Sequence, residues 1–233
     1  MKAMLLRVGI DKGTDGTLAP IFADGSFEYI PISEGDSRSK EDRTYRNTIG
    51  RTGKLLSVYL PSKIAGRKIH FDPEFKTFTY GDPTIKRNYL LKLGTGDLLV
   101  FYAGLKPFEN AKHKESLYLI GYFTIKKVID FNKLSRTEIR RCYALYPNNA
   151  HLKRSCSTWG LVIIIGDKNR SKLITKAVPI SQRKLDKRGR AYQAVSSRME
   201  KLLGISGSIQ RSIPPRTISN DKHINELKKL LMY

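Results

Sequence analysis

The chain has 233 residues, and 40% of them are hydrophobic, which is enough to form a folded core. Its 43 lysine and arginine residues outnumber its 21 aspartate and glutamate residues, and the formal net charge of +22 exceeds what solubility requires. No apolar run reaches the ~20 residues of a membrane-spanning helix, and the two cysteines, Cys142 and Cys156, form no metal or redox motif.

The distribution of charge indicates a polyanionic partner. Residues 1–50 are close to neutral, so the basic excess belongs to the rest of the chain and predicts one basic face. The apolar residues at the N-terminus are too few for a secretory signal and are soon followed by acidic residues. The basic residues do not fall on one amphipathic helix, so we expect no membrane binding and a cytoplasmic location.

The first predicted strand, Met4–Ile10, leads into the sequence D-K-G-T-D-G-T. Asp11, Thr14 and Gly16 after a strand resemble the phosphate-binding hairpin of actin-like kinases, although this chain is too short for their two lobes. Asp11, Asp15 and Gly16 also imitate half of a calcium loop, but Phe22 stands where that loop needs glutamate. The favoured interpretation is a simple turn between strands.

A second strand is predicted over Phe27–Ile32, where apolar and polar residues alternate. Residues 34–53 form a long polar loop of mixed charge that a ligand could order. A further strand is predicted over Leu55–Leu60.

The stretch I-H-F-D-P-E-F-K-T-F-T-Y-G-D contains the candidate catalytic residues. His70, Asp72 and Glu74 alternate, so on an extended chain their side chains would share one face and could bind a metal or act as an acid–base set. Pro73 interrupts that geometry. The alternatives are a loop packed by its aromatic residues, or an aromatic surface on which bases stack.

Asp82-Pro83 predicts a helix start, with the helix ending near Leu93. Strands are then predicted over Leu98–Tyr102 and Leu117–Ile129. The loop between them is longer than a tight hairpin needs, so it is either a contact element or a solvated connection. Its basic residues are Lys106, Lys112, His113 and Lys114.

The sequence S-R-T-E at Ser135–Glu138 predicts a capping box at the start of a helix that buries Cys142. A buried strand follows over residues 159–166. It begins with Trp159, which is either a core anchor or one wall of a pocket for a base.

The segment Asp167–Arg190 is the strongest candidate for phosphate contact, because basic residues far outnumber acidic ones there. It includes a predicted strand over Leu173–Ile180; a solvated basic face is the alternative. Its candidate contact residues are Lys168, Arg170, Lys172, Arg183, Lys184, Lys187, Arg188 and Arg190.

Two helices are predicted near the C-terminus. The first runs from Tyr192 to Leu203 and ends at Gly204. After a loop rich in serine, glycine and proline, the last helix presents one apolar face for docking on the core or for dimerisation, made of Ile224, Leu227, Leu230 and Leu231.

Two resemblances follow from these motifs. G-D-L-L-V-F-Y and L-I-G-Y-F-T-I are similar to the central strands of PUA-like domains, which bind RNA or flipped and modified bases. L-L-R-V-G-I-D-K-G, D-G-S-F-E-Y-I-P-I, H-F-D-P-E-F, T-Y-G-D and V-P-I-S together resemble the nucleotide modification associated domain, type three. That resemblance implies association with DNA base hypermodification systems and assigns no catalytic residue.

We therefore predict a single α+β domain over residues 1–233, with residues 205–233 as a helical end or appendage. Its core would be a partly closed, mixed, PUA-like β-barrel flanked by helices. The predicted function is recognition of a modified base, in DNA rather than RNA, by a basic face and an aromatic pocket of Trp159, Tyr102 and Tyr80. The alternatives are a base-modifying or nucleotide-modifying enzyme using His70, Asp72 and Glu74, and a structural RNA-binding protein. No cofactor is expected, and the oligomeric state is open.

Overall fold

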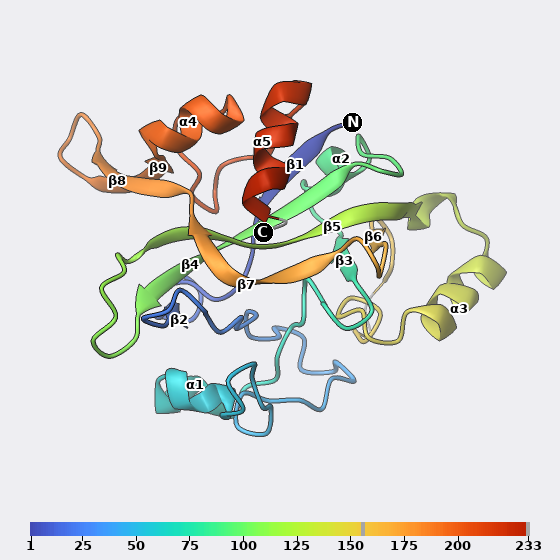
Figure 1. Cartoon of the computed structure of the whole chain (residues 1–233). Coiled ribbons are helices and arrows are strands. Elements are labelled where there is room, and N and C mark those ends of the chain that lie inside the picture. Colours follow the sequence, from blue (N-terminus) through green and yellow to red (C-terminus); the bar gives the residue numbers. More distant parts are fainter. Residues whose placement is uncertain (155–156, 232–233) are drawn as a thin grey trace.

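The computed structural model describes residues 1–154 and 157–231 as a mixed α+β fold (Figure 1). The strands are β1 (Ala3–Arg7), β2 (Ala19–Ile21), β3 (Thr79–Asp82), β4 (Leu98–Pro107), β5 (Ser116–Asp130), β6 (Val162–Gly166), β7 (Lys172–Pro179), β8 (Ser181–Leu185), β9 (Ala191–Val195) and β10 (Arg216–Ile218). The α-helices are α1 (Ser62–Ala65), α2 (Arg87–Leu90), α3 (Arg136–Leu145), α4 (Ser197–Leu203) and α5 (Asp221–Leu231), and 3₁₀ helices cover Leu56–Tyr59 and Phe131–Lys133.

Eight of the described strands form one mixed sheet in the order β10-β1-β4-β5-β6-β3, with β2 beside β4 and β7 beside β5. β1 and β2 run parallel to β4, and the other pairs of this sheet are antiparallel. The remaining two strands, β8 and β9, form a separate antiparallel hairpin. The α+β prediction is confirmed, whereas the described strands do not close into a barrel, so that detail of the prediction is not confirmed.

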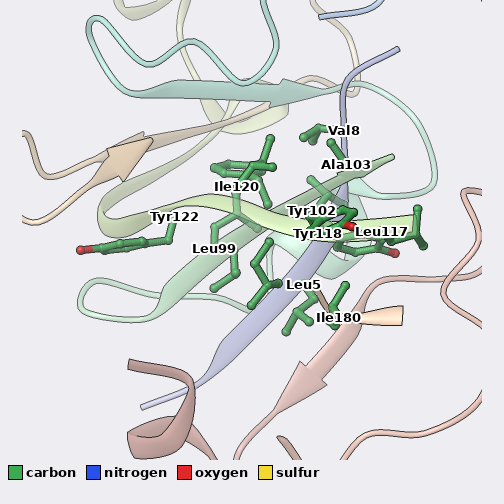
Figure 2. Close-up of a cluster of buried hydrophobic side chains, with 14 of the residues drawn as sticks. Leu5, Val8, Leu99, Tyr102, Ala103, Leu117, Tyr118, Ile120, Tyr122 and Ile180 are labelled. Carbon is green, nitrogen blue, oxygen red and sulfur yellow. The ribbon is translucent and has the colours of Figure 1, made fainter. Parts of the chain in front are cut away.

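The two apolar runs predicted as strands form β4 and β5, the longest strands of the sheet. Both faces of β4 are covered, which explains its continuous apolar sequence. Leu5 and Leu99 lie on one side of the β4–β5 ribbons and Val8 and Ala103 on the other (Figure 2). Residues 22–66 with α1 lie below the sheet in Figure 1, and α4 and α5 lie above it.

Three sequence predictions differ from the structure. Phe27–Ile32 is largely buried but forms no strand, because its single bridge joins Phe27 to Ile21 and its other backbone hydrogen bonds go to separate segments, at Ile10, Pro20 and His70. Leu55–Leu60 contains a 3₁₀ helix instead of a strand. The helix expected after Asp82 is confined to α2, since Asp82 belongs to β3 and caps a turn by accepting hydrogen bonds from the amide and hydroxyl of Thr84.

The C-terminal elements are packed on the main core. α4 begins after the Ser196 cap and ends at Gly204 in the left-handed conformation, whereas residues 191–195 are β9 rather than helix. The buried face of α5 joins the same apolar cluster as β1, β4 and β5 through Ile224, Leu227 and Leu231. The capping box of α3 and the burial of Cys142 are also confirmed. Among the described residues, no helix is long and apolar enough to cross a membrane.

Candidate functional site

A polar cavity of about 190 Å³, called here the small cavity, lies where the end of β1 meets β3 and the loop between α3 and β6. Segments far apart in the sequence meet there: β1, the approach to β3, the 149–154 loop and the loop between α4 and β10. The titratable residues that line it are Arg7, His70, Asp72, Tyr80, Asp82, Lys86, His151, Arg154 and Arg211.

Three of these lining residues, His70, Asp72 and His151, form a group called here the histidine cluster. One potential ligand atom from each residue lies within 4.8 Å of the others. Nε2 of His151 is 3.4 Å from Oδ2 of Asp72, and the Asp72 and His151 side chains are only 7% and 9% exposed. Two imidazoles and one carboxylate in this arrangement can bind a borderline metal ion or transfer protons.

Gly81 of β3 positions two members of the histidine cluster. Its amide donates a 2.9 Å hydrogen bond to Oδ1 of Asp72. A Cβ at this position would lie 2.6 Å from Cδ2 of His151, so only glycine admits the imidazole without displacement.

His70 is oriented by a buried carboxylate. Nδ1 of His70 lies 2.8 Å from Oε2 of Glu34, while Nε and Nη2 of Arg154 donate to Oε1 of Glu34 over 2.9 and 2.7 Å. Burial alone would raise the pKa of Glu34, but the hydrogen bonds from His70 and Arg154 outweigh it and lower that pKa strongly. Glu34 is therefore ionised, and its hydrogen bonds hold the side chains of His70 and Arg154 in position.

Asp82 and Lys86 also line the small cavity. The hydroxyl of Tyr80 donates to Oδ2 of Asp82 over 3.3 Å. Burial, followed by the charges of Asp72 and Asp82, raises the pKa of Tyr80 well above its usual value, so the phenol stays protonated. Burial lowers the pKa of Lys86, and the charge of Asp82 opposes that shift.

A second cavity of about 470 Å³, the large cavity, adjoins the first and shares Arg7 and Arg211 with it. Burial and then the charge of Arg211 lower the pKa of Arg7 to about 10. Within the described part of the chain, the buried Nε of Arg7 has no hydrogen-bond partner. Arg211 pairs with Asp11 and donates from Nη2 to the carbonyl oxygen of Gly9 over 2.5 Å. These two guanidinium groups, the arginine pair, can bind an anion between the cavities.

The glycine-containing loop after β1 lines the large cavity but satisfies its own amides. Oδ1 of Asp11 accepts hydrogen bonds of 2.9 Å from the amides of Gly13 and Thr14. Burial acts to raise the pKa of Asp11, but Arg211 and the hydrogen bonds from Thr14 lower it overall. The geometry is the turn that the sequence favours, because a phosphate-binding hairpin would direct these amides at a ligand.

The profile of one protein family, described as nucleotide modification associated domain 3, matches residues 2–207. The chain belongs to this family. The resemblance found in the sequence is thereby confirmed, and a role in nucleotide modification systems follows from the family description. No curated protein and no solved structure matches the chain significantly.

The structure brings His70 and Asp72 of this family member together, as expected, but not Glu74. The Glu74 carboxylate turns back to accept hydrogen bonds from the amide of Thr77 at 2.8 Å and from its hydroxyl. The alternation is broken at Pro73, so Glu74 closes a turn instead of facing the cavity. His151 takes the third position, and the sequence gives no local sign of it because its partners are distant along the chain.

The three aromatic residues predicted for a base pocket occupy different surroundings. Tyr80 lines the small cavity. The side chain of Tyr102 is buried, and its hydroxyl donates to the carbonyl oxygen of Ile209 over 3.0 Å. Trp159 is 78% exposed, so its interpretation as a core anchor is wrong.

Apart from Lys106, the predicted phosphate contacts fall into two groups toward opposite ends of the sheet. One group is near the turn before β7: Lys168, Arg170 and Lys172. The other lies at the opposite end of the sheet, on the β8–β9 hairpin (the basic hairpin, residues 181–195) and the β4–β5 loop, at the upper and lower left of Figure 1: Lys112, Lys114, Arg183, Lys184, Lys187, Arg188 and Arg190.

Some of these basic side chains form intramolecular contacts. Arg170 pairs with Asp167, Lys184 with Glu200 and Arg190 with Asp186, all with partly or fully exposed side chains. Lys106 belongs to β4, and its Nζ donates to the hydroxyl of Thr17 over 2.9 Å. Exposed pairs are worth ~1 kcal/mol or less, so a phosphate can compete with them.

A third cavity, of about 510 Å³ between α3 and β5, exceeds both the small and the large cavity in volume. Its lining offers no chemical cluster comparable to the histidine cluster or the arginine pair. It is bounded by Leu91, Val128, Cys142 and Leu145 together with charged residues at its edge. Burial raises the pKa of Cys142, which keeps the thiol protonated and unreactive. The candidate functional site is therefore the pair of cavities at Arg7 and Arg211.

Proposed function

We propose that this protein binds nucleic acid, DNA more readily than RNA, and takes one nucleotide into the cavities that meet at Arg7 and Arg211. The observation that carries the proposal is the arginine pair: Arg7 is half-buried with an enclosed Nε, Arg211 lowers its pKa, and both residues line the two cavities. A bound phosphate would relieve the repulsion between the guanidinium groups and accept hydrogen bonds from them.

The surroundings of the large cavity suit a strand of nucleic acid. The basic hairpin and the end of the β4–β5 loop both line it, through Ala191 and Gln193 and through Glu115. The two segments are joined nearby, where the hydroxyls of Ser116 and Ser181 lie 2.8 Å apart. Lysine and arginine residues of these two segments would bind successive phosphates, which supplies affinity without sequence preference. The net charge of +22 favours the same partner.

Discrimination between bases requires polar groups inside the cavity. Gln193 and Gln210 line the large cavity together with Asp11 and Lys12. Its volume lies within the range of ~300–1,000 Å³ that small-molecule sites occupy. Amide and charged groups at the edge of an extruded base can distinguish a modified base from a plain one. We therefore infer that the protein favours a modified base.

The test is a fluorescence anisotropy titration of the full chain with plain DNA, base-modified DNA and RNA of equal length, at two salt concentrations. The Arg211→Gln variant should bind DNA about tenfold more weakly, because a charge-assisted contact is lost. The Arg140→Gln variant removes the same charge from exposed α3 and should bind nearly as well as the wild type. Equal losses in the two variants would reduce the function to binding by net charge, and thermal unfolding of both variants checks that each one folds.

A second candidate is an enzyme that modifies the base or nucleotide, and the histidine cluster favours it. His70, Asp72 and His151 line the small cavity, next to the arginine pair. An enzyme would lose turnover and keep nucleic-acid affinity in Asp72→Asn. If the protein only binds nucleic acid, mass spectrometry should detect no conversion of the base with either the wild type or the Asp72→Asn variant.

A further inference from the structure

We propose that His70, Asp72 and His151 bind one divalent transition-metal ion whose open coordination positions face the small cavity. The site follows from the geometry of the histidine cluster alone. The role that we give the ion, contact with a nucleotide, rests on the proposed function.

The separations of the ligand atoms suit a metal better than a hydrogen-bonded pair. Nε2 of His151 and Oδ2 of Asp72 are 3.4 Å apart, which is longer than a normal hydrogen bond. It is also about the edge of a tetrahedron whose metal–ligand bonds are ~2.1 Å. The ligand atoms of all three residues lie within 4.8 Å. A small rotation of the side chains would bring the third ligand atom to bonding distance of the same ion.

The supporting residues match those of metal centres. Metal-binding histidines commonly use one ring nitrogen for the ion and the other for a carboxylate, which fixes the tautomer. Glu34 occupies Nδ1 of His70 and is itself held by Arg154, so Nε2 of His70 is the nitrogen assigned to the metal. Gly81 holds Oδ1 of Asp72, so Oδ2 is the oxygen assigned to it.

The number and type of ligands indicate which ion binds. Two imidazoles and one carboxylate leave at least one position for water or substrate and suit Zn²⁺, Fe²⁺ or Mn²⁺. Mg²⁺ and Ca²⁺ prefer sites made only of oxygen atoms and should bind weakly here.

The charges around the histidine cluster predict that binding of a metal ion and binding of an anion strengthen each other. Arg7, Lys86 and Arg211 line the small cavity and oppose a cation, whereas Asp72 and Asp82 favour it. A phosphate on the arginine pair would offset the positive charges and occupy an open position of the metal. The ion should therefore bind more tightly in the presence of a nucleoside monophosphate, and the nucleotide more tightly in the presence of the ion.

The test uses the full chain after removal of metals with a chelator, titrated with Zn²⁺ by calorimetry and with Co²⁺ by visible absorption. We expect one ion per chain. Asp72→Asn and His151→Gln should each lower the affinity at least ~10-fold. The control His113→Gln removes a histidine from the β4–β5 loop and should leave the affinity unchanged.

Three results would overturn the inference: no stoichiometric binding, equal affinity in Asp72→Asn and the wild type, or an equal loss in His113→Gln. Thermal unfolding with and without Zn²⁺ separates a folding defect from a lost site, because only folded protein with the site is stabilised by the ion. DNA binding measured on the same samples keeps the two proposals apart. Intact DNA binding with no metal binding refutes only the metal site, and the reverse result refutes only the nucleic-acid proposal.

Discussion

The imidazole rings of His70 and His151 form a T-shaped contact, with the edge of one ring against the face of the other. Their centroids are 4.8 Å apart and their planes lie at 85°. His70 lies on the approach to β3, and His151 lies in the loop that follows α3. The antiparallel pairing of β3 with β6 brings these distant segments together, because each histidine belongs to a loop that adjoins one of the two strands. The histidine cluster therefore depends on the pairing of β3 with β6 at the edge of the sheet.

Gly81→Ala should disturb the histidine cluster without unfolding the protein. The new Cβ would lie 2.6 Å from Cδ2 of His151, so the imidazole must move away from Asp72. We expect at least a tenfold loss of Zn²⁺ affinity in calorimetry and a loss of stability of about 1–2 kcal/mol. Gly66→Ala is the matched control, because a Cβ there meets nothing within 4 Å and its φ of −86° suits alanine. Unchanged Zn²⁺ affinity in Gly81→Ala would contradict the placement of His151.

The sequence predicts those features that depend on neighbouring residues. The runs at 98–102 and 117–129 form strands because their continuous apolar character matches burial on both faces. Glu74 shows the limit of local patterns, since one proline turned an alternating side chain away from the site. The partnership of His151 with His70 arises only from strand pairing, and no local spacing encodes it.

Stability should decrease in acid through Glu41. Burial acts to raise its pKa, but the hydrogen bonds from Arg43 and Lys153 outweigh it and lower that pKa to about 2. A lowered folded-state pKa stabilises the protein above the unfolded value of 4.5, and this contribution is lost as pH falls from there toward 2. Glu41→Gln should remove about 1–2 kcal/mol at pH 7, after allowance for solvent screening, and flatten the pH dependence.

The measurement is urea unfolding of both forms between pH 7 and pH 3. Glu41 is suited to this test because it joins the 41–43 turn to the loop of Lys153 and lies outside the histidine cluster. Parallel pH profiles for the wild type and the variant would show that Glu41 does not contribute this effect.

Trp159 should contribute to nucleic-acid binding and not to stability. Its side chain is 78% exposed, and a Cβ at the neighbouring Gly160 would lie 3.4 Å from the carbonyl oxygen of Pro83, a residue that lines the small cavity. Trp159→Ala should change the unfolding free energy by less than about 0.5 kcal/mol and weaken single-stranded DNA binding about tenfold through lost stacking. It is the only tryptophan, so quenching of its fluorescence by added DNA measures the contact directly. Unaltered DNA affinity in the variant would remove Trp159 from the binding surface.

The tip of the basic hairpin should determine part of the salt dependence. Lys187 and Arg188 are exposed there, and each phosphate contact contributes about 0.7–0.9 to the slope of log K against log[salt]. Replacing both by glutamine should lower the slope by about 1.5. The same exchange at exposed Arg136 and Arg140 of α3, at the opposite end of the sheet, should leave the slope unchanged (Figure 1). Identical slopes for the two double variants would show that the hairpin has no particular role.

The central claim is that a nucleotide enters the cavities at Arg7 and Arg211, and photochemical crosslinking with peptide mass spectrometry tests it most directly. A single-stranded DNA with one photoreactive base would be bound to the wild-type chain at moderate salt and irradiated. The account predicts crosslinks to residues that line the large cavity, in the 11–18 loop, β9 and the Gln210–Arg211 segment. Crosslinks confined to α3 or to the turn before β7 would contradict it.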